Sequence, residues 1–231
     1  MASLVLAAGF FLAIHLLVSG TGARDRLIAR LGATAYRGLF SLASLVGLVW
    51  LCLAYRDADV IVLWVRLPAL KPAALVGMAF AFALVVLGLT KPNPTGVGGE
   101  ALLATGRAAA PEPVGVQRIT RHPFLWGVAL WAVIHLAVNG DLASLVMFGA
   151  LAVLALCGTV SIDAKRRRAL GAAWAGFAAR TSNLPFLALA QGRTALRLGE
   201  HKPWEWLVVA GVYGVIVALH ASVFGVSPLP A

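Results

Sequence analysis

Charged residues are scarce in this chain, and acidic ones are scarcer than basic ones. Only 12% of the 231 residues are Asp, Glu, Lys or Arg, whereas 61% are hydrophobic, and the mean hydropathy is +0.89. A soluble domain of this size carries about twice that share of charge. The composition therefore excludes an ordinary soluble protein and predicts a protein that lies in a membrane.

Cysteine is also rare, and this excludes several kinds of site. Cys52 and Cys157 are the two cysteines, and each lies among apolar residues. They allow no disulfide framework, no zinc-binding spacing and no Cys-x-x-Cys-His motif for covalent haem. Acidic residues in or near the apolar runs are few, with Asp163 and Glu205 at the ends. A paired-carboxylate mechanism is therefore not expected.

What the chain does have is a series of long apolar runs. Each is close to the ~20 residues that cross a bilayer as a helix. The first has no basic residues before it, which argues against a cleavable signal peptide. We therefore predict an all-α integral membrane protein, a single domain over 1–231, with six transmembrane helices at about 3–22, 36–55, 72–89, 122–139, 142–160 and 204–222.

The basic residues are distributed unevenly between the connections. Sixteen of the 19 Lys and Arg residues follow the first, third and fifth runs, and the other three are Arg56, Arg66 and Lys71. Basic connections stay in the cytoplasm, so both termini are predicted to lie on the opposite, outer side of the membrane. This topology accounts for the net charge of +10, and no nucleic-acid partner is expected.

The connections differ in composition. The three residues 139–141 form a tight turn, so the runs before and after it are expected to make a hairpin. The 90–121 connection is rich in proline and glycine and is predicted to be an irregular cytoplasmic loop. The 161–203 connection interleaves basic and aromatic residues. It is predicted to be an amphipathic, interfacial segment on the cytoplasmic surface of the lipid bilayer.

Histidines lie within the apolar runs, where ionisable side chains are usually kept for function. His15 is placed toward the inner side of the first run, whereas His135 and His220 come to similar depths near the outer side. Imidazoles without thiolates or a Glu cluster suit axial ligation of haem b better than zinc. His15, His135 and His220 are therefore the candidate ligands of a haem iron, and the near-equal depths of His135 and His220 favour that pair if the helices do not tilt. Hydrogen bonding to a neighbouring helix is the structural alternative.

A second group of polar residues lies at the predicted cytoplasmic surface. Asn93 belongs to the Pro/Gly-rich connection, Arg121 and His122 precede the fourth run, and Asp163 follows the fifth. Loops on a rigid scaffold commonly carry function, so these four residues are predicted to line a cytoplasmic cleft. The alternative is that they only anchor helix ends at the head groups.

The chain resembles the NnrU family of bacterial inner-membrane proteins over nearly its whole length. The matching stretches are 24–27, 36–42, Arg118 to Phe124, Gly171, Trp174, 181–186 and the ending 224–230. NnrU proteins are associated with denitrification gene clusters. The resemblance therefore implies a link to nitrite and nitric oxide reduction.

That family is similar to the plant ζ-carotene isomerases, membrane enzymes that carry haem b. This similarity implies that His15 and His135 correspond to their haem ligands. The chain has Leu16 where the plant pattern has serine, and Ala132 where it has cysteine. The second difference removes the thiol that is tied to redox-dependent ligand exchange in those enzymes.

A remoter resemblance is to isoprenylcysteine and phospholipid methyltransferases. Their Arg-His-Pro-x-Tyr-x-Gly signature is matched by Arg121-His122-Pro123, but Leu125 stands in place of the tyrosine. Asp163 echoes a later acidic pair, although Ala164 follows it. The resemblance therefore implies a shared architecture, but these differences argue against S-adenosylmethionine binding.

Together these features predict a polytopic protein that binds haem b. Its expected role is redox chemistry or isomerisation of a lipophilic, membrane-soluble small molecule, or support of nitrogen-oxide respiration. The alternatives are a non-enzymatic factor that assembles a respiratory reductase, and a methyltransferase that acts on a lipid substrate.

Overall fold

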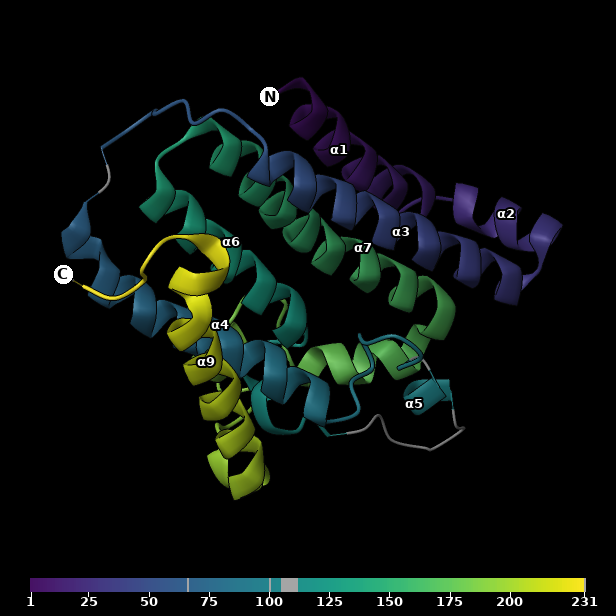
Figure 1. Cartoon of the computed structure of the whole chain (residues 1–231). Helices are drawn as coiled ribbons and strands as arrows, with labels where there is room; N and C mark the ends of the chain where they lie inside the picture. The colour runs from purple at the N-terminus through teal and green to yellow at the C-terminus, as the bar shows by residue number, and fades with distance from the viewer. Residues whose placement is uncertain (66, 100, 105–111, 231) are drawn as a thin grey trace. The chain divides into compact units, whose positions relative to one another are not determined.

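The computed structural model describes residues 1–65, 67–99, 101–104 and 112–230 (Figure 1). These residues form helices and no strand, apart from one isolated bridge between Val62 and Asp141, so the all-helical prediction is confirmed. Arg66 and Arg107, which were counted in the charge asymmetry, lie outside the described residues. The principal helices are α1 (Ala2–Ala13), α2 (Ala23–Leu31), α3 (Ala33–Arg56), α4 (Lys71–Thr90), α5 (Ala101–Ala104), α6 (Pro123–Asn139), α7 (Leu142–Arg180), α8 (Leu187–Ala190) and α9 (Pro203–Phe224).

Several of these helices are long and apolar enough to cross a membrane. In the described residues four qualify by length and composition, namely α3, α4 with the short turn before it, α7 and α9. A fifth is obtained if α1 and α2 are counted as one span. Helix α6 is apolar but has 17 residues, which is at the lower end of the spanning range.

The first apolar run is not one straight helix over 3–22. Helix α1 ends at Ala13, a π-helical turn follows at Ile14–Val18, and the chain then bends by 80° into α2. The charged residues Arg24, Asp25, Arg26 and Arg30 explain the bend, because they would be costly in hydrocarbon along the axis of α1.

The fifth run also differs from the prediction. The sequence predicts a span that ends near 160 and a separate interfacial segment from 161, whereas α7 continues as one element to Arg180. The backbone leaves helical geometry at Gly171, where φ is 49°. A left-handed φ is readily adopted by glycine, so Gly171 sets the place where α7 changes direction.

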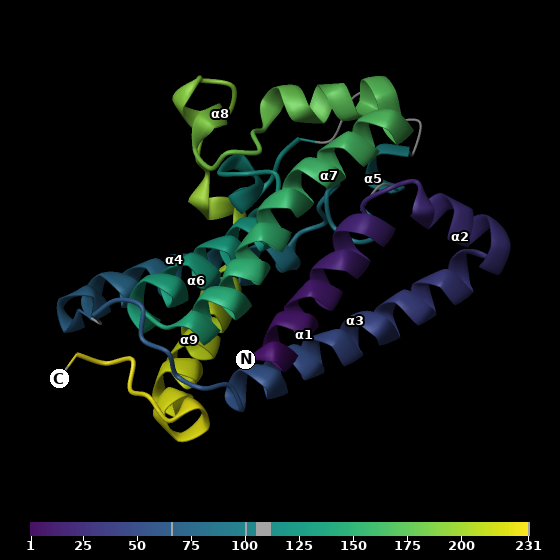
Figure 2. The ribbon, with the colours of Figure 1, turned by 90° about the horizontal axis from the view of Figure 1, so that it is seen from above.

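The described residues divide into two compact units, and α6 and α7 contribute to both. The first unit comprises 1–67 and 132–158. In it α1 lies alongside α3 (Figures 1 and 2), and both pack on the first turns of α7. Its core consists of Leu4, Ala7, Ala8, Phe11, Leu51, Ala54, Ala143, Met147 and Ala150.

The predicted tight turn between α6 and α7 is present in the first unit. Helix α6 ends at Asn139 and α7 begins at Leu142. The Asp141 carboxylate accepts the Ser144 backbone N–H at 2.8 Å and the Ser144 hydroxyl at 3.0 Å. This side-chain cap satisfies a donor that the helix leaves free.

The second unit comprises 68–131 and 159–231. Helix α4 packs along α9 (Figure 1), and the Tyr213 hydroxyl donates to the Leu75 carbonyl at 2.7 Å. Leu84 and Leu87 of α4 form the core with Val209 of α9 and two residues of the 114–119 segment, Val116 and Ile119.

Close packing of α1 on α3 gives the first prediction. A Cβ added at Gly47 would lie 2.9 Å from a ring carbon of Phe10, whereas one added at Gly38 would meet no atom within 4 Å. Gly47→Leu is therefore expected to cost about 1–3 kcal/mol, because it overpacks the helix pair. Thermal unfolding in detergent measures this cost. Gly38→Leu is the matched control, and an equal loss of stability in both variants would contradict the packing.

Candidate functional site

The Asp163 carboxylate of α7 lies at the centre of a buried polar cluster in the second unit. It accepts three hydrogen bonds from the Arg121 guanidinium at 2.6–3.0 Å and one contact from Nε2 of His122 at 2.7 Å. His122 is 2% exposed and Asp163 is 8% exposed. Burial makes this ion pair mutually dependent, since neither charge can be solvated if the other is lost.

Backbone hydrogen bonds hold the residues before α6 against the 181–186 segment. The Arg121 N–H donates to the Ser182 carbonyl at 2.9 Å, and the Phe186 N–H donates to the Ile119 carbonyl at 2.8 Å. The Thr120 hydroxyl donates to the Asn183 carbonyl at 2.7 Å. Arg121 and His122 therefore reach Asp163 from a segment that is fixed on both sides.

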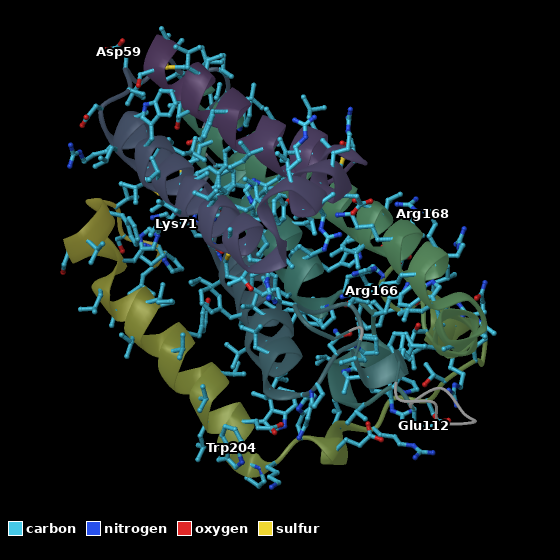
Figure 3. All side chains as sticks on the ribbon, turned by 90° about the vertical axis from the view of Figure 1, so that its right-hand side faces the viewer. Asp59, Lys71, Glu112, Arg166, Arg168 and Trp204 are labelled. Carbon is cyan, nitrogen blue, oxygen red and sulfur yellow. The ribbon has the colours of Figure 1, made fainter. Side chains whose placement is uncertain are left out.

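Asn93 contacts the backbone of this segment instead of the carboxylate. Its amide donates to the Arg121 carbonyl at 3.2 Å, and the Thr95 hydroxyl donates to the same oxygen at 2.6 Å. Arg166 of α7 holds the loop by donating to the Pro94 carbonyl at 2.9 Å and the Gly96 carbonyl at 3.0 Å. Figure 3 shows Arg166 and, further along α7, Arg168.

The structure thus brings together the four residues predicted for the cytoplasmic cleft, with Asn93 as a supporting residue. Sequence reasoning missed Asn183, whose amide is 3.5 Å from Asp163 and whose oxygen accepts the Trp126 indole N–H at 3.2 Å. It also missed the contact in which the Arg121 guanidinium lies 5.7 Å from the ring centroid of Trp174. Asn183 and Trp174 lie in stretches that carry the family resemblance, which was the available signal.

One ring nitrogen of His122 has no hydrogen-bond partner in this cluster. Nδ1 is buried and has no hydrogen-bond partner among the described residues. A doubly protonated ring would present an N–H at Nδ1 with no acceptor. The neutral ring with its proton on Nε2 donates to Asp163 and leaves a free lone pair on Nδ1.

A second buried network, not foreseen from the sequence, braces the 115–118 segment. His201 accepts the Val116 N–H on Nε2 at 3.1 Å, so its Nδ1 donates to Glu205 at 2.6 Å. Lys91 also donates to Glu205, at 2.7 Å. His201 and Glu205 are four residues apart at the start of α9, and this short spacing was the signal in the sequence.

The neighbouring pair in this network joins Arg118 to Glu200. The Arg118 guanidinium donates to both carboxylate oxygens at 2.7 and 2.9 Å, and this holds the pKa of Glu200 below its usual range. Gly115 has a φ of 57°, and a Cβ there would lie 2.0 Å from Nε2 of His201. Glycine is therefore required where this segment meets the His201 ring.

His15 lies in the first unit, within the π-helical turn Ile14–Val18. Its Nδ1 is 2.7 Å from the Phe11 carbonyl, and its Nε2 is 3.2 Å from the Ser44 hydroxyl of α3. The ring centroids of Phe11 and Phe40 are 4.4 and 5.2 Å away. Isolated π-helical turns frequently occur at functional sites.

His135 belongs to the same unit, and its ring contact leads through Phe148 of α7 to a different level of α3. Its ring stacks on Phe148 at 4.6 Å, and Phe148 packs on Tyr55 at 5.7 Å. His15 contacts Ser44, and the eleven residues from Ser44 to Tyr55 correspond to a helical rise of ~16 Å. The two rings are thus offset along α3.

His220 lies in the second unit and is not brought to the pair by any described contact. It belongs to α9, and its Nδ1 is 2.7 Å from the Val226 carbonyl. No group of three or more His, Cys, Asp or Glu side chains that could hold a metal ion occurs in the part of the chain that the structure describes. A haem iron needs fewer protein ligands than such a group supplies.

The surroundings of His15 fit a haem ligand in two respects. The Nδ1–H bond to the Phe11 carbonyl would fix the tautomer that leaves Nε2 for a metal, as in other metal-binding histidines. The Tyr36 hydroxyl is also buried without a hydrogen-bond partner among the described residues, and its ring stacks on Phe40. A buried polar atom without a partner is consistent with a group that the protein atoms do not provide.

Comparison with known proteins gives one match. The model of a family described as NnrU protein matches residues 3–228. No curated protein and no solved structure matches the chain.

The central role of Asp163 gives the second prediction. Asp163→Asn would remove the charge that compensates Arg121 and keep a side chain of similar size. Breaking a buried ion pair in this way typically costs about 3–5 kcal/mol, so a strong loss of thermal stability is expected. Asp57→Asn is the control, since Asp57 is exposed and its ion pair in the described part of the chain is with its neighbour Arg56. Unchanged stability of Asp163→Asn would contradict the arrangement.

Proposed function

The chain belongs to the NnrU family, and on this premise we propose that it is a membrane protein that binds haem b through His15 and His135. A bound haem would supply a redox-active iron, whose properties depend on the axial ligands and the surrounding dielectric. The proposed role is redox chemistry or isomerisation of a lipophilic small molecule, in support of nitrogen-oxide respiration. The respiratory link rests on the resemblance to denitrification proteins.

The π-helical turn at His15 is the observation that carries this proposal. The turn displaces one residue from regular helical geometry and places His15 between two phenylalanine rings. Its Nδ1 bond to a backbone carbonyl leaves Nε2, whose contact among the described residues is the hydroxyl of Ser44. An iron would take the place of that weak contact.

His135 is the proposed second ligand because it lies in the same unit and on a helix that enters it beside α7. The ~16 Å rise between the two levels of α3 exceeds the ~4 Å that would separate the two iron-bound nitrogens. The two rings are therefore farther apart along α3 than one iron allows, so haem binding by both residues would require the two side chains to come closer together.

The membrane arrangement is proposed in its full form here. Six spans require α6 and the bent α1–α2 pair to cross the bilayer in addition to the four long helices. The basic residues then lie on the inner surface of a bacterial plasma membrane, with both termini in the periplasm. The part of α7 beyond residue 160, with the segment that follows to 203, would be the interfacial portion.

Two other functions remain as alternative outcomes. A factor that assembles a respiratory reductase would be colourless and would co-purify with that enzyme. A methyltransferase would bind S-adenosylmethionine near Arg121 and His122, but Asp163 already engages both side chains. The haem proposal is preferred because the π-helical turn and the buried Tyr36 hydroxyl both point to the first unit.

The optical spectrum of the purified protein tests this proposal. Gently solubilised protein, loaded with haem b if necessary, is expected to show a six-coordinate Soret band. His15→Ala and His135→Ala should each lose that band, because each removes an axial ligand. His220→Ala and His122→Ala are the controls and should retain it. A full six-coordinate spectrum in His15→Ala would show that the assignment is wrong.

The topology is tested by reporter fusions. A periplasm-dependent reporter fused after Pro230 is expected to be active. The same reporter fused after Gln191, within the basic connection, is expected to be inactive, since basic connections are retained in the cytoplasm. A cytoplasmic C-terminus would overturn the six-span arrangement.

A further inference from the structure

The free nitrogen of His122 is the feature of the molecule that neither the haem site nor the packing explains. The residue is 2% exposed, and its Nδ1 has no partner among the described residues. His15 and His201 have contacts at both ring nitrogens, whereas the buried His122 ring is bonded through Nε2 alone among the described residues. A buried acceptor without a donor costs free energy, so its retention requires a reason.

The contacts of the ring determine what kind of group could satisfy Nδ1. Nε2 faces the Asp163 carboxylate at 2.7 Å, which accepts hydrogen bonds and does not donate them. The proton of the neutral ring is therefore on Nε2, and Nδ1 is an acceptor. The missing partner must be a hydrogen-bond donor.

The charges around the ring further restrict which chemical class of donor could bind Nδ1. Asp163 and Arg121 are the charged groups that face His122, and they compensate each other in one ion pair. An ammonium donor would add a buried charge with no free carboxylate to pair with it, at a large desolvation cost. A carboxylate or phosphate dianion has no proton to donate. A neutral hydroxyl, of a ligand or of a water molecule, meets both requirements.

The neighbouring side chains favour a lipophilic molecule. The Arg121 guanidinium that holds Asp163 lies over Trp174, and Trp174 packs with Phe177 and Leu103 in a buried apolar cluster. A hydroxyl with an apolar body therefore matches the polar and the apolar sides of this region. We propose that His122 accepts a hydrogen bond from the hydroxyl group of a lipophilic ligand, which makes the Arg121–His122–Asp163 cluster a second ligand site.

This inference rests on the proposed function in one respect, because the ligand belongs to the class of membrane-soluble molecules proposed there. It does not require haem. The Soret band reports on the first unit, whereas ligand binding at His122 reports on the second, so the two proposals can fail independently.

A matched pair of probes tests the hydroxyl. The probes are 1-decanol and its methyl ether, which have similar chains, but only the alcohol can donate a hydrogen bond. Full-length protein in nanodiscs is titrated with each probe, and binding is followed by the quenching of tryptophan fluorescence or by the shift in Tm. Wild-type protein is expected to bind the alcohol about five- to tenfold more tightly than the ether, the usual scale for one buried hydrogen bond. Equal binding of both probes would overturn the proposal.

Two variants test whether the preference for the alcohol depends on Nδ1 of His122. His122→Gln can still donate to Asp163 from its amide nitrogen but has no acceptor at the position of Nδ1, so it should bind both probes equally. His201→Gln is the control for the second buried histidine and should keep the preference for the alcohol. A preference that persists in His122→Gln would contradict the assignment.

A pH titration of the wild-type protein covers the case in which His122→Gln does not fold. Protonation of Nδ1 removes the acceptor, so the preference for 1-decanol should vanish at the acidic pH where His122 becomes charged, while the ether binds unchanged. Asp163 and Arg121 are the charged groups that set this point, through the contacts described above. A preference that persists once His122 is protonated would overturn the proposal.

Discussion

The Asp163 carboxylate is the constraint on which the second unit depends. It is the shared acceptor for Arg121 and His122, and all three side chains are largely withdrawn from water. The attraction is strong because the surroundings are apolar, and for the same reason no partner can be removed without leaving an uncompensated group. The backbone of this segment in turn receives the Asn93 amide and pairs with the 181–186 segment. The carboxylate thus anchors the segment at which the 93–96 loop and the 181–186 segment meet.

The first unit is organised by packing instead of by charge. Its core is made of small and aliphatic side chains, and Gly47 allows α3 to approach the aromatic rings of α1. The departure from regular geometry comes at His15, where a π-helical turn interrupts an otherwise apolar helix. Local irregularity of this kind persists when it serves a purpose, and ligand binding is the purpose proposed here. Each unit therefore carries one candidate site with its own chemistry.

The sequence alone predicted the features that depend on composition or on residues close together in the chain. Low charge and long apolar runs predicted an all-helical protein, and the turn at Asn139 to Asp141 was predicted from its residues alone. The grouping of Arg121, His122 and Asp163 was predicted as a cleft, but the direct ion pair was not. The bend after α1 and the extension of α7 past Gly171 were missed, since hydropathy does not report backbone geometry. The contact of His201 with the Val116 N–H spans more than eighty residues of sequence, which no local pattern encodes.

The protonation state of His122 is the property that tests this account most directly. Nitrogen NMR of the protein in nanodiscs, with ¹⁵N-labelled histidine and His122→Gln to assign the signal, distinguishes the two neutral tautomers and the charged ring. We expect a neutral ring at neutral pH, with the proton on Nε2 and an unprotonated Nδ1. A ring that carries its proton on Nδ1, or on both nitrogens, would contradict it.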